Sequence, residues 1–430
     1  MSKTSILLAV LLVNFAALSQ PYTSYFTGSS MDVIASPEGG VCLMGGATED
    51  DEAMKWFLNR ADGGDVLVLR TSGSDGYNDY MYSQLGITLN SVETIVFNGT
   101  FAVNDAYIHQ KIKQAEAIWF AGGDQWNYIS FWRDSPIDSL INEGIENRDV
   151  VVGGTSAGMA ILGNPYFSAQ NGTVTSGIAL SNPYHSDVTV DNTPFLDAPF
   201  MGNVISDTHY DDPDRKGRHM VFLARMVKDN GVIAKGIACD EHTAVCIDEN
   251  GLARIYGEFP SSNDNAYFLQ VNCELADPTP EMCQSGLALD WNHGGAAVKV
   301  YAVKGNQTGQ NTFDLSDWQT GNGGLWKHWY VDNGVLQETN GNAPSCSVSL
   351  DEDEDEKFLV FPNPGRDIIN ISFTNLEPHI IEIYSADGRL QISTEAKQKE
   401  ITISTEPLQK GSYIIHAISE QGNQSVSWVK

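Results

Sequence analysis

The sequence predicts an α/β domain with a mostly parallel sheet flanked by helices, followed by a small all-β sandwich. Between residues 38 and about 345, charge-poor strand segments alternate with amphipathic helical segments, a pattern typical of a parallel sheet covered on both faces. Three predicted strands run into paired glycines, at 45–46, 122–123 and 153–154. Sites in parallel sheets gather at the carboxyl ends of strands, so these turns mark the expected site.

The elements of the α/β region follow from their residue types. Apolar and β-branched runs predict strands at 41–44, 65–69, 91–97, 117–120 and 150–152. Helical spacing predicts helices at 49–60, 76–85, 105–114 and 136–147. Further on, a strand-like run covers 202–210 and an amphipathic helix follows at 220–227. Residues 261–292 look like an insertion.

The tail is predicted to be a separate module. Residues 346–356 are expected to form an extended linker, because the alternating Asp and Glu at 351–356 repel one another and cannot pack. A calcium loop is the alternative, but the run lacks the spaced ligands and the turn glycine. Residues 357–430 then predict the sandwich. Its strands are expected at 368–373, 380–384, 400–403, 412–417 and 425–429, with turns at 386–388 and 420–422.

The charge balance excludes some partners. The 430 residues include 55 Asp and Glu against 25 Lys and Arg, a formal net charge of −30. Such a surface repels nucleic acid and anionic membranes, so we expect neither as a partner. It could attract a cationic substrate, although acidity more often serves solubility.

The first twenty residues have the layout of a secretory signal peptide. Lys3 precedes an apolar run from Ile6 to Leu18, and small residues then lead to Pro21. The run is too short to span a membrane. No later segment has 18 consecutive apolar residues, so we expect a secreted, soluble mature protein.

The six cysteines fit export. Cys273 and Cys283 flank a loop that a disulfide could close, and Cys239 and Cys246 could also pair. Cys42 lies in a predicted strand as a candidate buried thiol. There is no C-x-x-C and no paired Cys/His pattern, so neither a metal site nor another cofactor is expected.

Residues 149–158 have the pattern of a nucleophile elbow. A valine run leads into Gly154-Thr155-Ser156-Ala157-Gly158, and a helix can begin directly after it. Glycines on both sides relieve the crowding of a sharp turn. This predicts Ser156 as a nucleophile with the Ala157 amide beside it; a glycine-rich turn that binds a phosphate or nothing is the alternative.

A serine nucleophile needs a base and an acid that orients the base. His209 stands at the end of the 202–210 run, and Asp207 shares its face because side chains alternate along an extended chain. Asp240 and Glu241 are adjacent carboxylates between apolar strand residues, which favours a role for one of them in orienting an imidazole. The order Ser–His–acid along the chain differs from that of the α/β-hydrolases, chymotrypsin and subtilisin.

Four motifs in this order resemble the cyanophycinase and peptidase E family of serine peptidases, whose fold is similar to class I glutamine amidotransferases. They are Phe120-Ala121-Gly122-Gly123-Asp124-Gln125, the segment 153–158, Asp207-Thr208-His209-Tyr210 with the downstream arginines, and Asp240-Glu241 followed by Thr243-Ala244. The resemblance covers roughly residues 38–345.

The resemblance implies a role for each matching residue. Ser156 would be the nucleophile, His209 the general base and Glu241 the orienting acid. The amides of Gly123 and Ala157 would form the oxyanion hole. Positions that shape substrate binding in the family match Asp124, Gln125, Asp207, Thr208, Arg215 and Arg218. An arginine can grip the free α-carboxylate of an aspartyl residue with two hydrogen bonds.

Two departures bear on the substrate. Thr208 takes the place of the glutamine usual in cyanophycinases, and Pro213 stands where their arginine series begins. We expect a serine peptidase for aspartyl or β-aspartyl bonds, with cyanophycin (multi-L-arginyl-poly-L-aspartate) as a candidate substrate. An aspartyl dipeptidase without cyanophycin activity and a non-catalytic surface binding protein are the alternatives. Glutamine amidotransfer would require cysteine at position 156.

The tail resembles the C-terminal sorting domain of type IX secretion cargo. Phe361-Pro362-Asn363-Pro364, the segment 381–389 and Leu408 with Gly411-Ser412-Tyr413 carry this resemblance over 357–430. It implies export to the medium or the cell surface, with the secretion machinery as a partner. A carbohydrate-binding or adhesive module is the alternative. A homodimer is compatible with the family, but one chain does not identify a dimer face.

Overall fold

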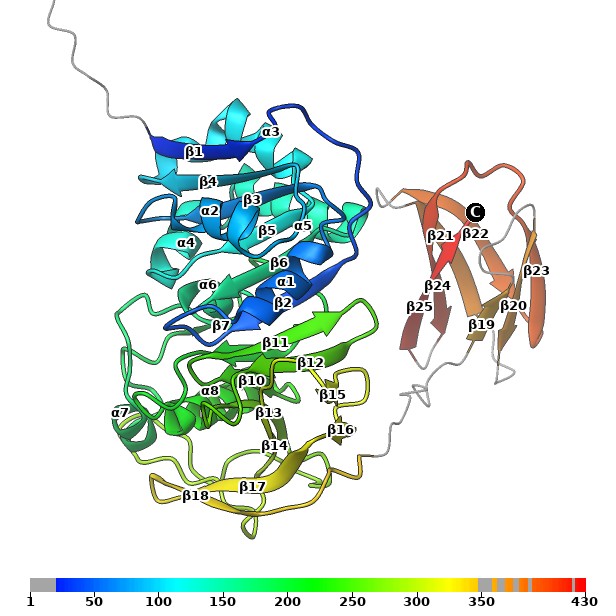
Figure 1. Ribbon diagram of the computed structural model, residues 1–430. Coiled ribbons are helices and arrows are strands. Elements are labelled where there is room, and N and C mark those ends of the chain that lie inside the picture. The colour runs from blue at the N-terminus through cyan, green and yellow to red at the C-terminus, as the bar shows by residue number, and fades with distance from the viewer. Residues whose placement is uncertain (1–20, 347–357, 362–367, 374–378, 386–388, 420–421) are drawn as a thin grey trace, which may run out of the picture. The chain divides into compact units, whose positions relative to one another are not determined.

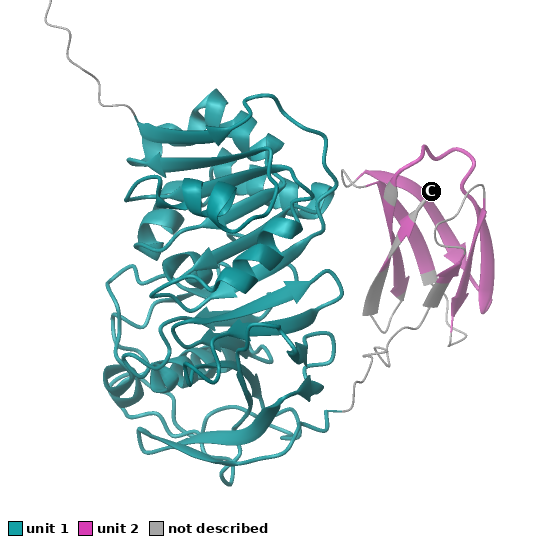
Figure 2. Cartoon of the chain, viewed as in Figure 1, with its two compact units in different colours: residues 1–346 teal, residues 347–430 magenta. Residues whose placement is uncertain are grey.

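The computed structural model describes residues 21–346, 358–361, 368–373, 379–385, 389–419 and 422–430. The chain forms two compact units, residues 1–346 and 347–430 (Figure 2). The predicted signal peptide at 1–20, residues 347–356 of the predicted linker and the motif residues 362–364 lie outside the described residues. So do 386–388 and 420–421 of the predicted turns.

A ten-stranded sheet forms the centre of the first unit, in the order β1-β4-β3-β5-β6-β2-β11-β12-β15-β16 (Figure 1). Its strands are β1 Tyr22–Gly28, β2 Gly40–Met44, β3 Asp65–Arg70, β4 Ser91–Phe97, β5 Ala117–Phe120, β6 Val151–Thr155, β11 Thr243–Asp248, β12 Leu252–Gly257, β15 Asn311–Asp314 and β16 Gly321–Asn322. The strands from β4 to β2 are parallel, whereas β1 and the strands from β11 onward are antiparallel. The predicted fold class is confirmed, with an antiparallel extension that the sequence pattern did not indicate.

Helices cover both faces of this sheet. They are α1 Asp51–Asn59, α2 Gly76–Asp79, α3 Ala106–Gln114, α4 Gln125–Trp132, α5 Pro136–Arg148 and the short α6 Ala157–Ala160. Side chains alternate along β2: Val41 and Leu43 join the core with α3, α4 and α5, whereas Cys42 and Met44 join the core with α1. Both faces of the parallel strands are therefore buried.

Three of these helices begin after a polar residue that caps their N-terminus. Asp105, Asp124 and Ser135 each accept a hydrogen bond from the N–H of the second helical residue, which satisfies a donor that has no partner inside the helix. Asp124 does this directly after the Gly122-Gly123 turn, so α4 starts at the expected site edge.

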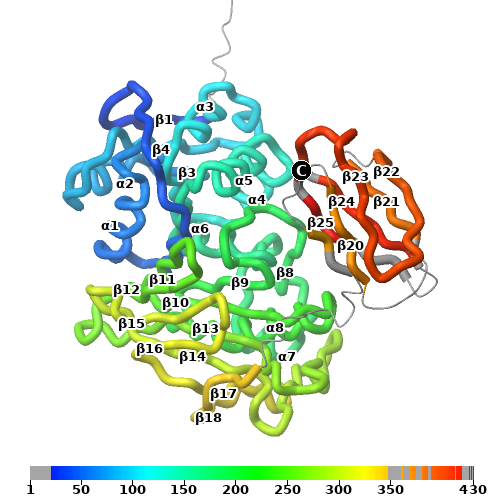
Figure 3. The backbone as a smooth tube through the Cα atoms, turned by 90° about the vertical axis from the view of Figure 1, so that its right-hand side faces the viewer, coloured from blue at the N-terminus to red at the C-terminus, as the bar shows by residue number. Residues whose placement is uncertain are grey.

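A second sheet of six strands completes the first unit, in the order β18-β17-β14-β13-β10-β9. Its strands are β9 Val204–Asp207, β10 Lys235–Cys239, β13 Asn265–Val271, β14 Val298–Lys304, β17 Gly324–Asp332 and β18 Val335–Asn340. Helix α8, Lys216–Asn230, contains the helix predicted at 220–227 and packs on the second sheet (Figure 3). The segment 261–292, which looks like an insertion in the sequence, contains β13, and this strand pairs with both β10 and β14.

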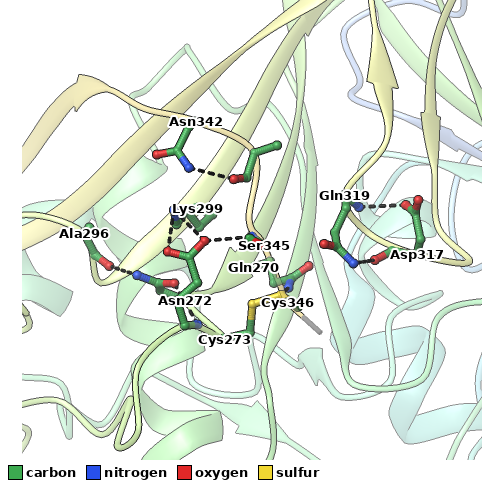
Figure 4. The surroundings of a disulfide bond; sticks show 12 residues. Gln270, Asn272, Cys273, Ala296, Lys299, Asp317, Gln319, Asn342, Ser345 and Cys346 are labelled. Carbon is green, nitrogen blue, oxygen red and sulfur yellow. Dashed lines mark hydrogen bonds and ion pairs between the residues drawn. A yellow bond between two sulfur atoms is a disulfide. The ribbon is translucent and has the colours of Figure 1, made fainter. Parts of the chain in front are cut away.

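The disulfide of the first unit joins Cys273 to Cys346, 73 residues apart (Figure 4). The structure has Cys42, Cys239, Cys246 and Cys283 as buried free thiols. The pairing suggested for Cys273 with Cys283 is wrong because Cys273 is bonded to Cys346, and the pairing suggested for Cys239 with Cys246 is wrong because these two residues belong to cores on opposite faces of the sheet. Spacing along the chain did not identify the partner of Cys273, because Cys346 is brought next to it by the folding of the intervening strands β14, β17 and β18.

The second unit is built from two antiparallel sheets, as predicted for a sandwich. Their orders are β19-β20-β23 and β22-β21-β24-β25. The strands are β19 Phe358–Phe361, β20 Ile368–Phe373, β21 His379–Ser385, β22 Leu390–Ala396, β23 Glu400–Ser404, β24 Ser412–Ser419 and β25 Gly422–Val429. Buried Ile369 and Ile371 of β20 share one core with Ile381 and Ile383 of β21.

Candidate active site

Ser156 lies at the sharp turn between β6 and α6. Its backbone has φ 53° and ψ −116°, a conformation that costs free energy for any residue other than glycine. A Cβ at Gly158 would lie 1.9 Å from the Phe120 carbonyl oxygen, so only glycine fits there. The Ser156 N–H donates to the Met44 carbonyl at 3.1 Å, which ties the turn to the end of β2.

His209 follows β9 of the second sheet and reaches Ser156 across the boundary between the two sheets. Its Nε2 lies 2.8 Å from Ser156 Oγ, and its backbone N–H donates to the Gly45 carbonyl at 2.9 Å. Gly46 makes room for the ring: a Cβ at this position would lie 2.4 Å from His209 Nε2. The glycine pair after β2 therefore holds the histidine in reach of the serine.

Glu241 contacts the other nitrogen of the same imidazole. Its Oε1 lies 2.5 Å from His209 Nδ1, and the two side chains are 27% and 23% exposed. The neighbouring Asp240 turns away, and its Oδ2 accepts the Asn265 N–H at 2.8 Å. Burial raises the pKa of Asp240 to about 6, against the lowering effect of the Asn265 hydrogen bonds. The two adjacent carboxylates thus have different surroundings.

The turn after β5 lies against Ser156. A Cβ at Gly122 would be 3.6 Å from Ser156 Cβ, and Gly123 has φ 155°. The Tyr128 hydroxyl of α4 donates to the Ala121 carbonyl at 2.7 Å and so ties this turn to the helix that follows it. Ala157 is the first residue of α6, so its N–H has no acceptor within the helix. Gly122 therefore lies against the serine, Gly123 is the next residue of the same turn, and Ala157 follows Ser156 directly along the chain.

Asp207 and Arg218 form a buried ion pair. Arg218 Nε donates to Asp207 Oδ2 at 2.9 Å and Nη2 donates to Oδ1 at 2.5 Å, and both side chains are 3% exposed. Arg218 Nη1 also donates to Thr173 Oγ1 and to the Val174 carbonyl. Burial alone would raise the pKa of Asp207, but the Arg218 charge outweighs it, and the pKa is lowered. These contacts occupy Asp207 and Arg218, two of the six residues that the resemblance implies for substrate binding.

Arg215 has free hydrogen-bonding capacity. Its Nη1 donates to the Thr208 carbonyl at 2.8 Å and lies 3.4 Å from Thr208 Oγ1. Its buried Nε has no hydrogen-bond partner among the described residues. Thr208 is itself buried, and its N–H donates to Asp207 Oδ1 at 2.9 Å. Of the two arginines, Arg218 is buried in an ion pair with Asp207, whereas Arg215 is half-buried and has no such partner among the described residues.

Asp124 and Gln125 lie at the start of α4. Besides capping this helix, Asp124 is exposed to solvent. Gln125 Nε2 lies 3.4 Å from the Phe167 carbonyl, which places it beside β7, Tyr166–Phe167. Both side chains thus start from the same turn as Gly123.

Comparisons with known proteins bear on both units. Residues 74–255 match the model of peptidase family S51. The first unit is similar to this family over these residues. Residues 359–430 match the secretion system C-terminal sorting domain.

A cyanophycinase of Geminocystis herdmanii is 23% identical over 229 residues, which are 51% of this chain and 77% of that protein. A cyanophycinase of Trichormus variabilis is 22% identical over 151 residues, 35% of this chain and 45% of that protein. The structure of a peptidase from an acI-B1 actinobacterium superposes with a TM-score of 0.37 and 16% identity, over 52% of this chain and 89% of that one.

Together the two family matches support a peptidase hydrolase that carries a type IX sorting domain and is secreted or located at the cell surface. No helix of the described residues is both long and apolar enough to cross a membrane. In the same part of the chain, His, Cys, Asp and Glu side chains form no group of three that could hold a metal ion.

Two contributors to the site were not predicted. The Gly45-Gly46 pair was recognised as a turn at a strand end, but no local pattern links Gly46 to a histidine 163 positions later. Asp211 accepts the Glu241 N–H at 3.3 Å and so fixes the backbone of the acid. In the sequence, Asp211 is distinguished only by its place two residues after His209.

Proposed function

We propose that the chain is a secreted serine peptidase in which Ser156, His209 and Glu241 form the catalytic triad. The observation that supports this most strongly is the hydrogen-bond chain through the imidazole: 2.8 Å from Ser156 Oγ to Nε2 and 2.5 Å from Nδ1 to Glu241 Oε1. Three residues from three separate segments meet in the order that acyl transfer requires. The strained Ser156 backbone adds support, because such strain persists where the surrounding structure enforces it.

The chemistry follows from this arrangement. Ser156 Oγ attacks the carbonyl carbon of the scissile amide while His209 Nε2 takes the hydroxyl proton. Glu241 stabilises the imidazolium that forms, and the Gly123 and Ala157 amides stabilise the oxyanion. His209 then gives its proton to the leaving amine. Water, deprotonated by the same imidazole, releases the acid from the acyl-enzyme.

The proposed substrate is an aspartyl or β-aspartyl peptide, including cyanophycin. The relatives named cyanophycinase support this class. Arg215 is the proposed carboxylate-binding residue, because its side chain is half-buried rather than fully buried and, among the described residues, no carboxylate forms an ion pair with it. Asp207 and Arg218 are assigned to holding the segment before His209, since their charges already neutralise each other. Gln125 and the exposed Asp124, at the start of α4, are also proposed to contact the substrate.

The test is a digest of soluble cyanophycin beside α- and β-aspartyl dipeptides, with products identified by mass. We expect the wild-type chain to release aspartyl products and Ser156→Ala to lower kcat by about 10⁴-fold or more. Ser130→Ala is the matched control, because Ser130 is an exposed serine of α4. If wild type and Ser156→Ala are equally inactive on all substrates, the peptidase proposal is wrong and the alternative of a non-catalytic binding protein is favoured. Activity on dipeptides alone would assign an aspartyl dipeptidase.

A further inference from the structure

Two thiols face each other in the core between the ten-stranded sheet and α1. Cys42 of β2 and Cys246 of β11 are direct partners in the antiparallel register of these strands. The Cys246 thiol donates to Cys42 Sγ at 3.6 Å, and both residues are fully buried. Directly paired residues of antiparallel strands have Cα atoms about 4.5–5.5 Å apart. That spacing lies within the range of about 4.4–6.8 Å found for disulfides.

The alternation of side chains leaves Cys42 and Cys246 as the one matched pair among the four free thiols. Cys42 and Cys246 both point into the core on the α1 face of the sheet. Cys239 belongs to the core on the opposite face, and Cys283 to the core of the second sheet. A disulfide between Cys239 and Cys246 would have to cross the sheet, whereas Cys42 and Cys246 need only side-chain rotation.

We propose that Cys42 and Cys246 form a second disulfide in the exported protein, linking β2 to β11. The chain already carries the Cys273–Cys346 disulfide and a sorting domain for export, and disulfides form in such oxidising compartments. The oxidant is a disulfide donor of the thiol oxidoreductase class. One cysteine thiolate attacks the donor and expels a thiolate, and the second then attacks the mixed disulfide and expels the other. Two thiols lose two protons and two electrons, and the donor is reduced to a dithiol before the sheet closes over the pair.

The position of this link connects it to the site. Just beyond Cys42, β2 provides the Met44 carbonyl to Ser156 and the Gly45 carbonyl to His209. At the other end of the pair, β11 begins two residues after Glu241, and the Gly45 N–H donates to the Thr243 carbonyl. A covalent bond between β2 and β11 therefore stabilises the strand pair on which all three proposed catalytic residues depend.

The first measurement counts thiols in the full chain after export. The protein is unfolded in guanidinium with iodoacetamide and no reductant, then digested and analysed by mass. We expect alkylation of Cys239 and Cys283 alone, together with a digest product that joins the Cys42 and Cys246 peptides. Alkylation of all four free cysteines would overturn the proposal. The readout does not use peptidase activity, so it stands apart from the proposed function.

The second measurement compares melting temperatures with and without reductant. Reduction should lower the melting temperature of the wild type by about 5 °C more than that of the Cys42→Ala/Cys246→Ala double variant. The Cys273–Cys346 bond contributes equally to both. Cys239→Ala is the matched control, since it removes a fully buried thiol outside the pair and should respond to reductant as the wild type does. An equal shift in the wild type and the double variant would contradict the proposal.

Discussion

Replacing Gly46 with alanine tests whether the glycine pair after β2 positions the histidine. The added Cβ would lie 2.4 Å from His209 Nε2 and 2.5 Å from Cε1, whereas ordinary contacts begin at 3.4 Å. The ring must therefore retreat by about 1 Å (3.4 − 2.4). Retreat away from Gly46 would lengthen the Ser156 Oγ–Nε2 distance from 2.8 Å to as much as about 3.8 Å, beyond a hydrogen bond. A misplacement of about 1 Å costs on the order of 10²-fold in rate.

The assay for Gly46→Ala is kcat/KM on the substrate that the wild type cleaves best, with the melting temperature measured in parallel. Gly46 has φ 116°, so alanine also adds backbone strain of about 1–2 kcal/mol. Gly99→Ala controls for this strain, because Gly99 has φ 144° and no atom within 4 Å of the added Cβ. We expect both variants to melt earlier, and the Gly46 variant alone to lose activity by about 10²-fold.

A Gly46→Ala variant with wild-type kcat/KM would refute this reasoning. It would mean that the imidazole has a second productive position, or that His209 is not the base. Equal losses of activity in the Gly46 and Gly99 variants would assign the effect to backbone strain rather than to the histidine.

Two further predictions concern charged groups near the site. Arg215→Ala should raise KM with little change in melting temperature. Arg218→Ala should instead destabilise the fold by about 3–5 kcal/mol, because it leaves the Asp207 carboxylate buried without its partner. If Arg215→Ala lowers the melting temperature and Arg218→Ala only raises KM, Arg218 is the substrate-binding arginine and Arg215 the structural one. Burial raises the folded-state pKa of Asp240 from 3.8 to about 6, so the folded state holds this proton more tightly than the unfolded chain. The associated stability is fully present below about pH 4 and is lost as the pH rises through 6, a loss of up to about 3 kcal/mol. Asp240→Asn should flatten this part of the curve of melting temperature against pH and be more stable than wild type at pH 8; parallel curves for the two proteins would contradict the assignment.

The local features of this chain were predictable because neighbouring residues encode them. The valine run with glycines around Ser156 predicted the strand, the turn and the helix start, and the structure has β6 and α6 there. The parallel strands were predicted from their charge-poor segments. The catalytic roles of Ser156, His209 and Glu241 remain predictions, although the structure joins their side chains by hydrogen bonds.

Other features depend on partners that are remote in sequence. Arg215 and Arg218 are equivalent by spacing, yet only Arg218 reaches Asp207. Cys273 was matched to the nearby Cys283, but the second sheet brings Cys346 to it instead.

By itself, the sequence determined the α/β class, the turn at Ser156 and the sandwich of the tail, because hydrophobic period, glycine placement and helix caps act over a few residues. The tertiary structure alone decided that β9 belongs to the second sheet, that Gly46 faces His209 and that Cys42 faces Cys246. Strand order and register set these contacts, and they are fixed by how whole faces of the two sheets pack, which no short stretch of sequence encodes.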